Sequence, residues 1–430
     1  MEIRPIRGRF RLLSLKRGYS LWLRQWRRKE RQVREMDKPQ QEIGFLCRAA
    51  DHPRETVLRA MEKTGKRAVG CFPLYTPDEL VDAAGFLPVG MWGGPGESPR
   101  SGQYLQPFCC SVMRANMSQA LDGVYDMLSG VLIPTFCDTL KCVAENWKAG
   151  IPNIPVFPMV YPQNVGSAAA AAYLEDEFIR IKEKLEQLAG RGITEESLVE
   201  SFDRFERCRS VMREFTGLAA SHPDLISAKT RHKILKSYYF MDKPEYTEIL
   251  NGINEELKKR KGSRDSNPVR VVVTGLMLEP DALLNVLDAN RLCIAADDLA
   301  QESRNFRVQG SREGTVLQRM ARRFLDQRGD PFLCEQGKSR GKHLIEMVRQ
   351  TGAAGVLIVM MKFCEPEEFD FPVYRKELDQ AGIPYLYIEL EQSMSQAESI
   401  STRMEGFVEV LRNTNASLGN GSDRSAHLLR

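Results

Sequence analysis

The sequence predicts an α/β protein with two Rossmann-like domains, each built on a parallel sheet, and a helical middle segment between them. Two observations lead to this prediction. Short apolar runs of strand length alternate with helix-start signals near both ends of the chain. Between them, residues 168–260 carry apolar side chains at helical spacing within long charged stretches. The chain has 430 residues, more than one ordinary core holds, so several domains are expected.

The first α/β region begins with a buried strand predicted over residues 67–72. A helix follows, and Thr76 and Glu79 have the spacing of a capping box at its start, with Thr76 as the N-cap. Further short apolar runs predict strands over 86–89 and 130–134. Strands that alternate with helices in this way are typical of a parallel sheet.

The rest of the chain first changes pattern and then returns to it. In the middle segment, the helical spacing is clearest in Leu174, Phe178, Ile181, Leu185 and Leu188. In the third region, strands are predicted over 269–274, 292–296, 355–360 and 383–388. Turn-rich and charged stretches then divide the chain into a basic extension (1–40), an N-terminal α/β domain (41–165), a helical segment (166–265), a C-terminal α/β domain (266–412) and a disordered tail (413–430).

The composition excludes several classes of protein. Hydrophobic residues make up 42% and charged residues 27%, as in an ordinary globular protein. No run approaches the roughly 18 to 20 apolar residues that span a bilayer, and no secretory signal is found, so we expect a cytoplasmic protein. Nucleotide and nucleic-acid motifs are also missing: the glycine-rich stretch 90–96 lacks the strand and helix of a dinucleotide site.

The N-terminal extension is strongly basic. Residues 1–34 hold twelve Lys or Arg and only two Glu, with Trp22 and Trp26 among the arginines. We favour a solvated extension, or a translation start at Met36, over a helix that touches a membrane surface or an acidic partner. An arginine-rich, acid-poor composition is also found in organelle transit peptides.

Ten cysteines are the main chemical feature of the sequence. In a chain without a secretory signal they are expected to be reduced thiols or metal ligands. Cys137 and Cys364 each follow a predicted strand, where parallel sheets place ligands, and Cys109 and Cys110 precede a predicted helix. Wide spacing along the chain does not distinguish a metal site from buried structural thiols. An α/β protein of the periplasmic-binding type with incidental cysteines therefore stays open at this point.

Four segments in order resemble the 2-hydroxyacyl-CoA dehydratase / benzoyl-CoA reductase superfamily. They are residues 70–94, 110–114, 136–158 and 362–389, and the likeness extends from about residue 44 to residue 412. The resemblance is to the D-component, the iron–sulfur subunit. It implies a 4Fe-4S cluster with Cys110, Cys137 and Cys364 as its three ligands. Cys109 is the alternative to Cys110, whereas Cys142 and Cys334 are expected to be structural.

The resemblance also implies the chemistry. The cluster delivers one low-potential electron to a CoA thioester, and the ketyl radical that forms expels the 2-hydroxyl group as water. The iron without a thiolate is the open reactive position, and no catalytic side chain is assigned. The CoA thioester is expected to contact Trp92, Gly93, Gly94 and Arg114. The alternative for Trp92 is a core position, for the glycines turns, and for Arg114 a surface ion pair.

Two further expectations follow from the family. The partners are a second related subunit or a second copy of the chain, together with an ATP-dependent iron–sulfur activator, because the chain has no nucleotide motif of its own. The function is that of an iron–sulfur subunit in a 2-hydroxyacyl-CoA dehydratase. The alternatives are a subunit of benzoyl-CoA reductase type and a non-catalytic electron-transfer member that has kept the scaffold.

Overall fold

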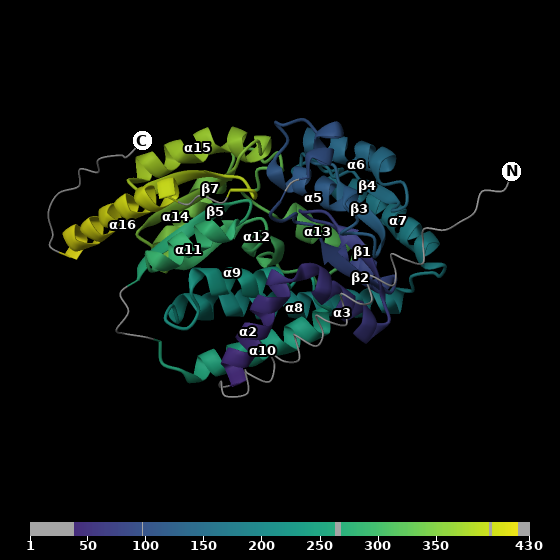
Figure 1. Cartoon of the computed structure of the whole chain (residues 1–430), viewed down its shortest axis with the longest axis horizontal. Coiled ribbons are helices and arrows are strands. Elements are labelled where there is room, and N and C mark those ends of the chain that lie inside the picture. The colour runs from purple at the N-terminus through teal and green to yellow at the C-terminus, as the bar shows by residue number, and fades with distance from the viewer. Residues whose placement is uncertain (1–37, 97, 263–267, 395–397, 420–430) are drawn as a thin grey trace.

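The computed structural model describes residues 38–96, 98–262, 268–394 and 398–419 (Figure 1). Two four-stranded sheets, both parallel throughout, have the strand orders β2-β1-β3-β4 and β6-β5-β7-β8. Figure 1 shows the first sheet at the right, the second at the upper left, and the helices of residues 195–259 along the bottom. The predicted α/β class is confirmed, because both sheets have the parallel pairing that alternating strands and helices imply.

The first sheet forms from the four short apolar runs between residues 67 and 159. Its strands are β1 (Arg67–Cys71), β2 (Phe86–Gly90), β3 (Leu128–Pro134) and β4 (Val156–Met159). Its helices are α4 (Asp78–Ala83), α5 (Ser111–Leu121) and α6 (Asp138–Gly150), and the chain enters through α2 (Lys38–Asp51) and α3 (Pro53–Thr64). Gly70 sits where β1 pairs with both neighbours, and a Cβ there would collide with Met91 and Leu128. Glycine is therefore required for the central strand to pack this closely.

The predicted capping box at Thr76 and Glu79 is wrong. Helix α4 begins one residue later than predicted, Pro77 occupies the N-cap position, and no side chain caps the helix. The hydroxyl of Thr76 instead lies 3.2 Å from a carboxylate oxygen of Asp78. The Glu79 side chain is buried and ion-paired with arginines of distant helices, so tertiary packing has overridden the local capping pattern.

The middle segment is helical, as its spacing predicts. It contains α7 (Ala170–Ala189), α8 (Glu195–Ser221), α9 (Ala228–Ser237) and α10 (Lys243–Lys259). The apolar faces of these helices join the core of the first sheet, and the same core reaches Leu276 and Cys364 in the C-terminal region. The chain therefore buries apolar side chains continuously from the first sheet to the edge of the second.

The second sheet consists of β5 (Val269–Gly275), β6 (Leu292–Leu299), β7 (Gly355–Met361) and β8 (Tyr385–Leu390). The helices of this region are α11 (Asp281–Ala289), α12 (Ser303–Phe306), α13 (Val316–Leu325), α14 (Arg340–Thr351), α15 (Glu365–Ala381) and α16 (Glu398–Gly419). Successive residues of β5 face opposite sides: Val271 and Val273 enter one apolar core and Val272 the other. All of β7 is buried, which confirms the central strand predicted at 355–360.

The ends of the chain are only partly described. Residues 1–37, which hold most of the predicted basic extension, lie outside the described residues, and so do residues 420–430. Helix α16 continues through residues 413–419, the first part of the predicted tail. The domain boundaries remain predictions. Within the described ranges, no helix is both long enough and apolar enough to cross a bilayer.

Candidate functional site

Cys110, Cys137 and Cys364 line one cavity. This cavity has about 420 Å³ of empty volume, part of it open to solvent. Each cysteine is the N-cap of a helix: Cys110 of α5, Cys137 of α6 and Cys364 of α15. Three thiols that are widely separated in sequence therefore meet where three helices begin.

The sheets explain why the three cysteines meet. Cys137 follows the carboxyl end of β3 and Cys364 follows the carboxyl end of β7, the edges where parallel sheets bind ligands. The start of α5 is held against this second edge by Ser111. Its hydroxyl lies 3.1 Å from Sδ of Met361 and accepts a hydrogen bond from the backbone N–H of Gln392 at 3.0 Å. The cavity is thus formed jointly by the first and second sheets.

Helix termini make the cavity suitable for negative charge. The N-terminal end of a helix carries a partial positive charge, and here three such ends face the same space. The backbone N–H groups of Met113, Leu140 and Glu367, each in the first turn after a cysteine, favour the thiolate form of that cysteine. None of the three thiols makes a full capping hydrogen bond.

Without a cation the thiols are held protonated. Burial raises the pKa of Cys110 to about 12, and the neighbouring thiol of Cys137 adds to the rise. Burial also raises the pKa of Cys137, and it raises the pKa of Cys364 well above its ordinary value, assisted by the carboxylate of Glu367. A bound metal centre would reverse this balance, because its positive charge stabilises the thiolate, so a coordinating thiol releases its proton to solvent.

The donor set fits an iron–sulfur cluster. Thiolates are the ligands that such clusters take, and each iron of a cluster can take one thiolate, so the ligands surround a cavity and do not converge on one point. The ligands of a single ion, bound at about 2.3 Å, lie within roughly 4 Å of each other. In the described part of the chain, no three His, Cys, Asp or Glu side chains are grouped closely enough to hold one ion.

The cavity wall is mostly apolar. Besides the cysteines, it is formed by Pro73, Leu74, Met113, Thr139, Leu140, Leu276, Phe332, Phe363, Glu365 and Pro366. Leu74 and Phe363 adopt φ angles of +74° and +63°, in the left-handed region that side chains other than glycine rarely occupy. Backbone strain of this kind is often found at functional sites, where the surrounding structure compensates for it.

The remaining candidate cysteines lie outside the cavity. Cys109 is buried, but its thiol is turned toward Thr139 and takes no part in the cavity wall. Cys142 is exposed on α6, and Cys334 is an exposed residue whose backbone N–H bonds to Gln163 at 2.7 Å. The structure therefore groups the three predicted ligands around one cavity, while Cys109 lies beside Thr139, a residue of the cavity wall. Their role as ligands remains a prediction.

The model of one protein family, the 2-hydroxyglutaryl-CoA dehydratase D-component, matches residues 73–411. The chain belongs to this family. The beta subunit of (R)-phenyllactyl-CoA dehydratase from Clostridium sporogenes is 37% identical over 361 residues, which cover 84% of this chain and 96% of the relative. The beta subunit of lactoyl-CoA dehydratase from Anaerotignum propionicum is 39% identical over 377 residues, or 86% and 98% of the two chains.

A more distant relative belongs to the reductase branch. One of the subunits of benzoyl-CoA reductase from Thauera aromatica is 25% identical over 353 residues, which cover 81% of this chain and 91% of the relative. The resemblance seen in the sequence is thus confirmed. The chain is a subunit of a dehydratase- or reductase-type enzyme of this family.

One of the residues predicted to contact CoA, Trp92, lies next to the cysteine cavity. Trp92 is buried against Tyr239, with 5.5 Å between ring centroids, and lines a neighbouring cavity that shares Pro73 and Leu74 with the cysteine cavity. The tight turn after Trp92 needs glycine at Gly93, where φ is +71°. Trp92 is thus a core residue and Gly93 a turn residue, as their alternatives predicted. Contact of these two residues with CoA remains a prediction.

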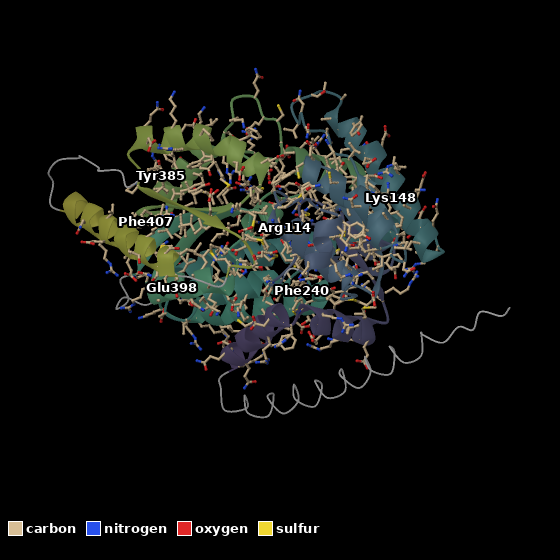
Figure 2. All side chains as sticks on the ribbon, turned by 45° about the horizontal axis from the view of Figure 1, so that its top comes forward. Arg114, Lys148, Phe240, Tyr385, Glu398 and Phe407 are labelled. Atoms are coloured by element: carbon tan, nitrogen blue, oxygen red, sulfur yellow. The ribbon has the colours of Figure 1, made fainter. Side chains whose placement is uncertain are left out.

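Arg114 and Gly94 complete the predicted set. Figure 2 places Arg114 near the centre of the molecule, between the elements of the first sheet and those of the second. Its guanidinium pairs with Glu391 at 2.9 Å, so the predicted alternative, an ion pair, is present, and it joins the two halves of the chain. A Cβ at Gly94 would lie 2.9 Å from the amide of Gln119, so this glycine also packs closely.

One feature of the site was not predicted from the sequence. A buried network of arginines and carboxylates lies directly behind Cys364 and includes Asp298, Arg304, Arg340, Glu367 and Asp370. A sign of it was present in the sequence: Asp297 and Asp298 directly follow the strand predicted over 292–296, and the structure includes both in the mostly buried β6, where charges are rare.

Proposed function

We propose that the chain is the iron–sulfur subunit of a 2-hydroxyacyl-CoA dehydratase, with a 4Fe-4S cluster held by Cys110, Cys137 and Cys364. One observation carries the proposal: three N-cap cysteines, from three separate helices, line one apolar cavity. The names of the relatives give the substrate class, since they refer to dehydratases of phenyllactyl-CoA, lactoyl-CoA and 2-hydroxyglutaryl-CoA.

Such a cluster, when bound, supplies one low-potential electron that makes loss of water from a 2-hydroxyacyl thioester feasible by way of a ketyl radical. The chain's own residues hold it and keep water away. Leu74, Leu276 and Phe332 present apolar surface to the cavity, so water is excluded from the place where a radical would be lost by side reactions. The three helix ends offset the negative charge of the thiolates.

The CoA thioester is proposed to approach between the two halves of the chain, where Trp92, Gly93, Gly94 and Arg114 lie. Gly93 adopts a positive φ angle in the turn after Trp92, and Arg114 supplies a cation for an anionic group of CoA. Binding of CoA phosphate by Arg114 would compete with its ion pair to Glu391, so the two contacts are alternatives for the same guanidinium.

Partners and location follow from the relatives and the thiols. The relatives are named as beta subunits, so we infer a second related subunit, with a second copy of the chain as the alternative. An ATP-dependent activator is inferred as the source of the electron, because the sequence has no nucleotide motif. Ten free cysteines fit a reducing compartment, which supports a cytoplasmic location.

A benzoyl-CoA reductase-type subunit is the second candidate, supported by the relative from Thauera aromatica. The two functions need the same electron but different substrates. The test is anaerobic co-expression with a related second subunit and an ATP-dependent activator, followed by product analysis with ATP and a reductant. Enoyl-CoA formed from a 2-hydroxyacyl-CoA supports the proposal, and ring reduction of benzoyl-CoA instead supports the second candidate.

The cysteine variants complete the test. Cys110→Ala, Cys137→Ala and Cys364→Ala are each expected to abolish product formation, whereas the matched control Cys142→Ala, an exposed thiol on α6, is expected to retain it. Turnover of neither substrate by a complex with an intact cluster would overturn the enzymatic proposal and favour a non-catalytic electron-transfer subunit. Turnover that survives all three substitutions would overturn the site.

A further inference from the structure

The buried network behind Cys364 is made of fully desolvated charges. Asp298, Arg304 and Glu367 have side chains that are 0% exposed, and Arg340 is 1% exposed. Arg304 bonds Glu367 at 3.0 Å and Asp298 at 3.1 Å, while Arg340 lies 2.7 Å from Glu367 and 3.0 Å from Asp298. Two arginines and two carboxylates thus form a closed ring of ion pairs, which we call the arginine ring.

A buried ion-pair ring of this kind is weak evidence for stability. The desolvation of each charge offsets much of the attraction, and apolar side chains of the same volume often stabilise a fold equally well. The role of the ring is therefore better judged from its position in the fold than from its effect on stability. It joins the carboxyl ends of β5 and β6, through Thr274 and Asp298, to the starts of α14 and α15.

Glu367 connects the arginine ring to the cysteine cavity. It lies three residues after the N-cap Cys364 in the first turn of α15, and its backbone N–H favours the thiolate of that cysteine. Its side chain points away from solvent into the ring, held by Arg304 and Arg340. The first turn of α15 is thus fixed from both sides, with the side chain clamped and the backbone facing the thiol.

The ring also reaches the loop that contributes Leu74 to the cavity wall. Nη1 of Arg304 lies 4.0 Å from Asp330, and Asp330 accepts a hydrogen bond from the hydroxyl of Tyr75. Tyr75 adopts a φ of +61° and follows Leu74, a residue of the cavity wall. Contacts centred on Arg304 therefore connect the first turn after Cys364 with the strained loop at Leu74 and Tyr75.

We propose that Glu367, clamped by Arg304 and Arg340, is a positioning residue that fixes Cys364 and balances the charge of the two arginines beside the cluster. The inference rests on the proposed function. An unbalanced arginine charge in a low-dielectric site would favour the addition of an electron, so Glu367 keeps the reduction potential of the cluster low, as a donor of a low-potential electron requires.

The matched test compares Glu367→Gln with Glu79→Gln in the whole chain. Glu79 is an equivalent control, because it is 1% exposed and pairs with two arginines, Arg209 and Arg323, each at 2.7 Å, outside the cysteine cavity. Each protein is reconstituted anaerobically, and its cluster is titrated by visible and EPR spectroscopy. We expect a more positive reduction potential in Glu367→Gln and the wild-type potential in Glu79→Gln.

A second measurement keeps the inference independent of cluster assembly. In cluster-free protein, Cys364 is alkylated with iodoacetamide and followed by peptide mass spectrometry, and Glu367→Gln is expected to react at least several-fold faster than wild type. Glu367→Asp, which keeps the charge, is expected to stay near the wild-type potential. An unchanged potential and alkylation rate in Glu367→Gln, or an equal shift in Glu79→Gln, would overturn the proposal. Failure of the wild type to take up iron would instead count against the proposed function, and the alkylation comparison would still decide the role of Glu367.

Discussion

The reactivity of Cys110 in cluster-free protein follows directly from its burial. Its side chain is 7% exposed and shares a mostly apolar cavity with two further thiols, and burial raises its pKa to about 12. Raising the pH is therefore the perturbation of choice. Between pH 8 and pH 10 a thiol of ordinary pKa near 9 is largely converted to thiolate, whereas Cys110 should remain almost entirely protonated.

The magnitude can be worked out from these values. A pKa of about 12 gives a thiolate fraction of about 10⁻⁴ at pH 8 and about 10⁻² at pH 10, a hundredfold rise. A thiol with a pKa near 9 rises only about tenfold over the same interval, because it approaches full ionisation. Since the thiolate is the reactive form, the alkylation rate of Cys110 should follow pH with a slope near one on a logarithmic scale.

The assay is a timed pulse of iodoacetamide on chelator-stripped, anaerobic protein, with each modified cysteine quantified by peptide mass spectrometry. Two internal controls are present in the chain. Cys142 is exposed and should react first, while Cys208, which is 0% exposed in α8, should react only on unfolding. A Cys110 rate that levels off before pH 10, or that equals the Cys142 rate at pH 8, would refute the reasoning.

Three further predictions concern stability, measured as the urea midpoint of unfolding. Gly275→Ala should cost about 3 kcal/mol or more, because φ is +142° and a Cβ would collide with a backbone carbonyl of β7; a midpoint unchanged within about 0.3 M would contradict this. Trp147→Phe should lower the free energy of unfolding by about 2–4 kcal/mol, because the carbonyl of Ile154 loses the indole N–H that donates to it at 3.0 Å and part of the core is left empty. A loss of less than about 0.5 kcal/mol would contradict this prediction. Burial opposes ionisation of Glu279, but the ammonium of Lys236 lowers the pKa of this carboxyl to about 2. The ionised carboxylate should therefore stabilise the fold by about 3 kcal/mol above pH 4.5, and this contribution should be lost as the pH falls toward 2. Glu279→Gln should remove this part of the acid dependence of stability, and an acid profile identical to that of the wild type would refute the prediction.

Much of the fold was predictable because its strands are marked by local composition. The run at 355–360 is apolar throughout, and the structure makes it the fully buried β7. The strand predicted over 292–296 was too short, since β6 continues through Asp297 and Asp298 to Leu299. A carboxylate rarely lies within a buried strand, and what permits it here is pairing with arginines from α9, α12 and α14.

Local signals failed where a distant part of the chain supplies the partner. Thr76 and Glu79 have the spacing of a capping box, yet Glu79 is bound by Arg209 and Arg323, more than a hundred residues away. The start of α6 shows the same limit of local signals: Asp138 is of a type that often caps helices, but Cys137 takes the N-cap position and lines the cavity.

The three-cysteine grouping shows the limit of sequence reasoning most clearly. The spacing of the cysteines along the sequence did not distinguish a metal site from structural thiols, because no local pattern indicates that the N-termini of three helices lie together. Family resemblance supplied the expectation, and the structure then brought Cys110, Cys137 and Cys364 to one cavity with Cys109 outside it. The arginine ring had no comparable precursor, since its members come from four different elements.

The most direct test of the central claim is the iron and acid-labile sulfide content of anaerobically purified protein. About four irons and four sulfides per chain are predicted in the wild type, as a 4Fe-4S cluster requires. Both should be lost in Cys110→Ala, Cys137→Ala and Cys364→Ala and retained in Cys142→Ala. Iron that is absent after anaerobic reconstitution, or that survives all three substitutions, would contradict the assignment of this cavity as the cluster site.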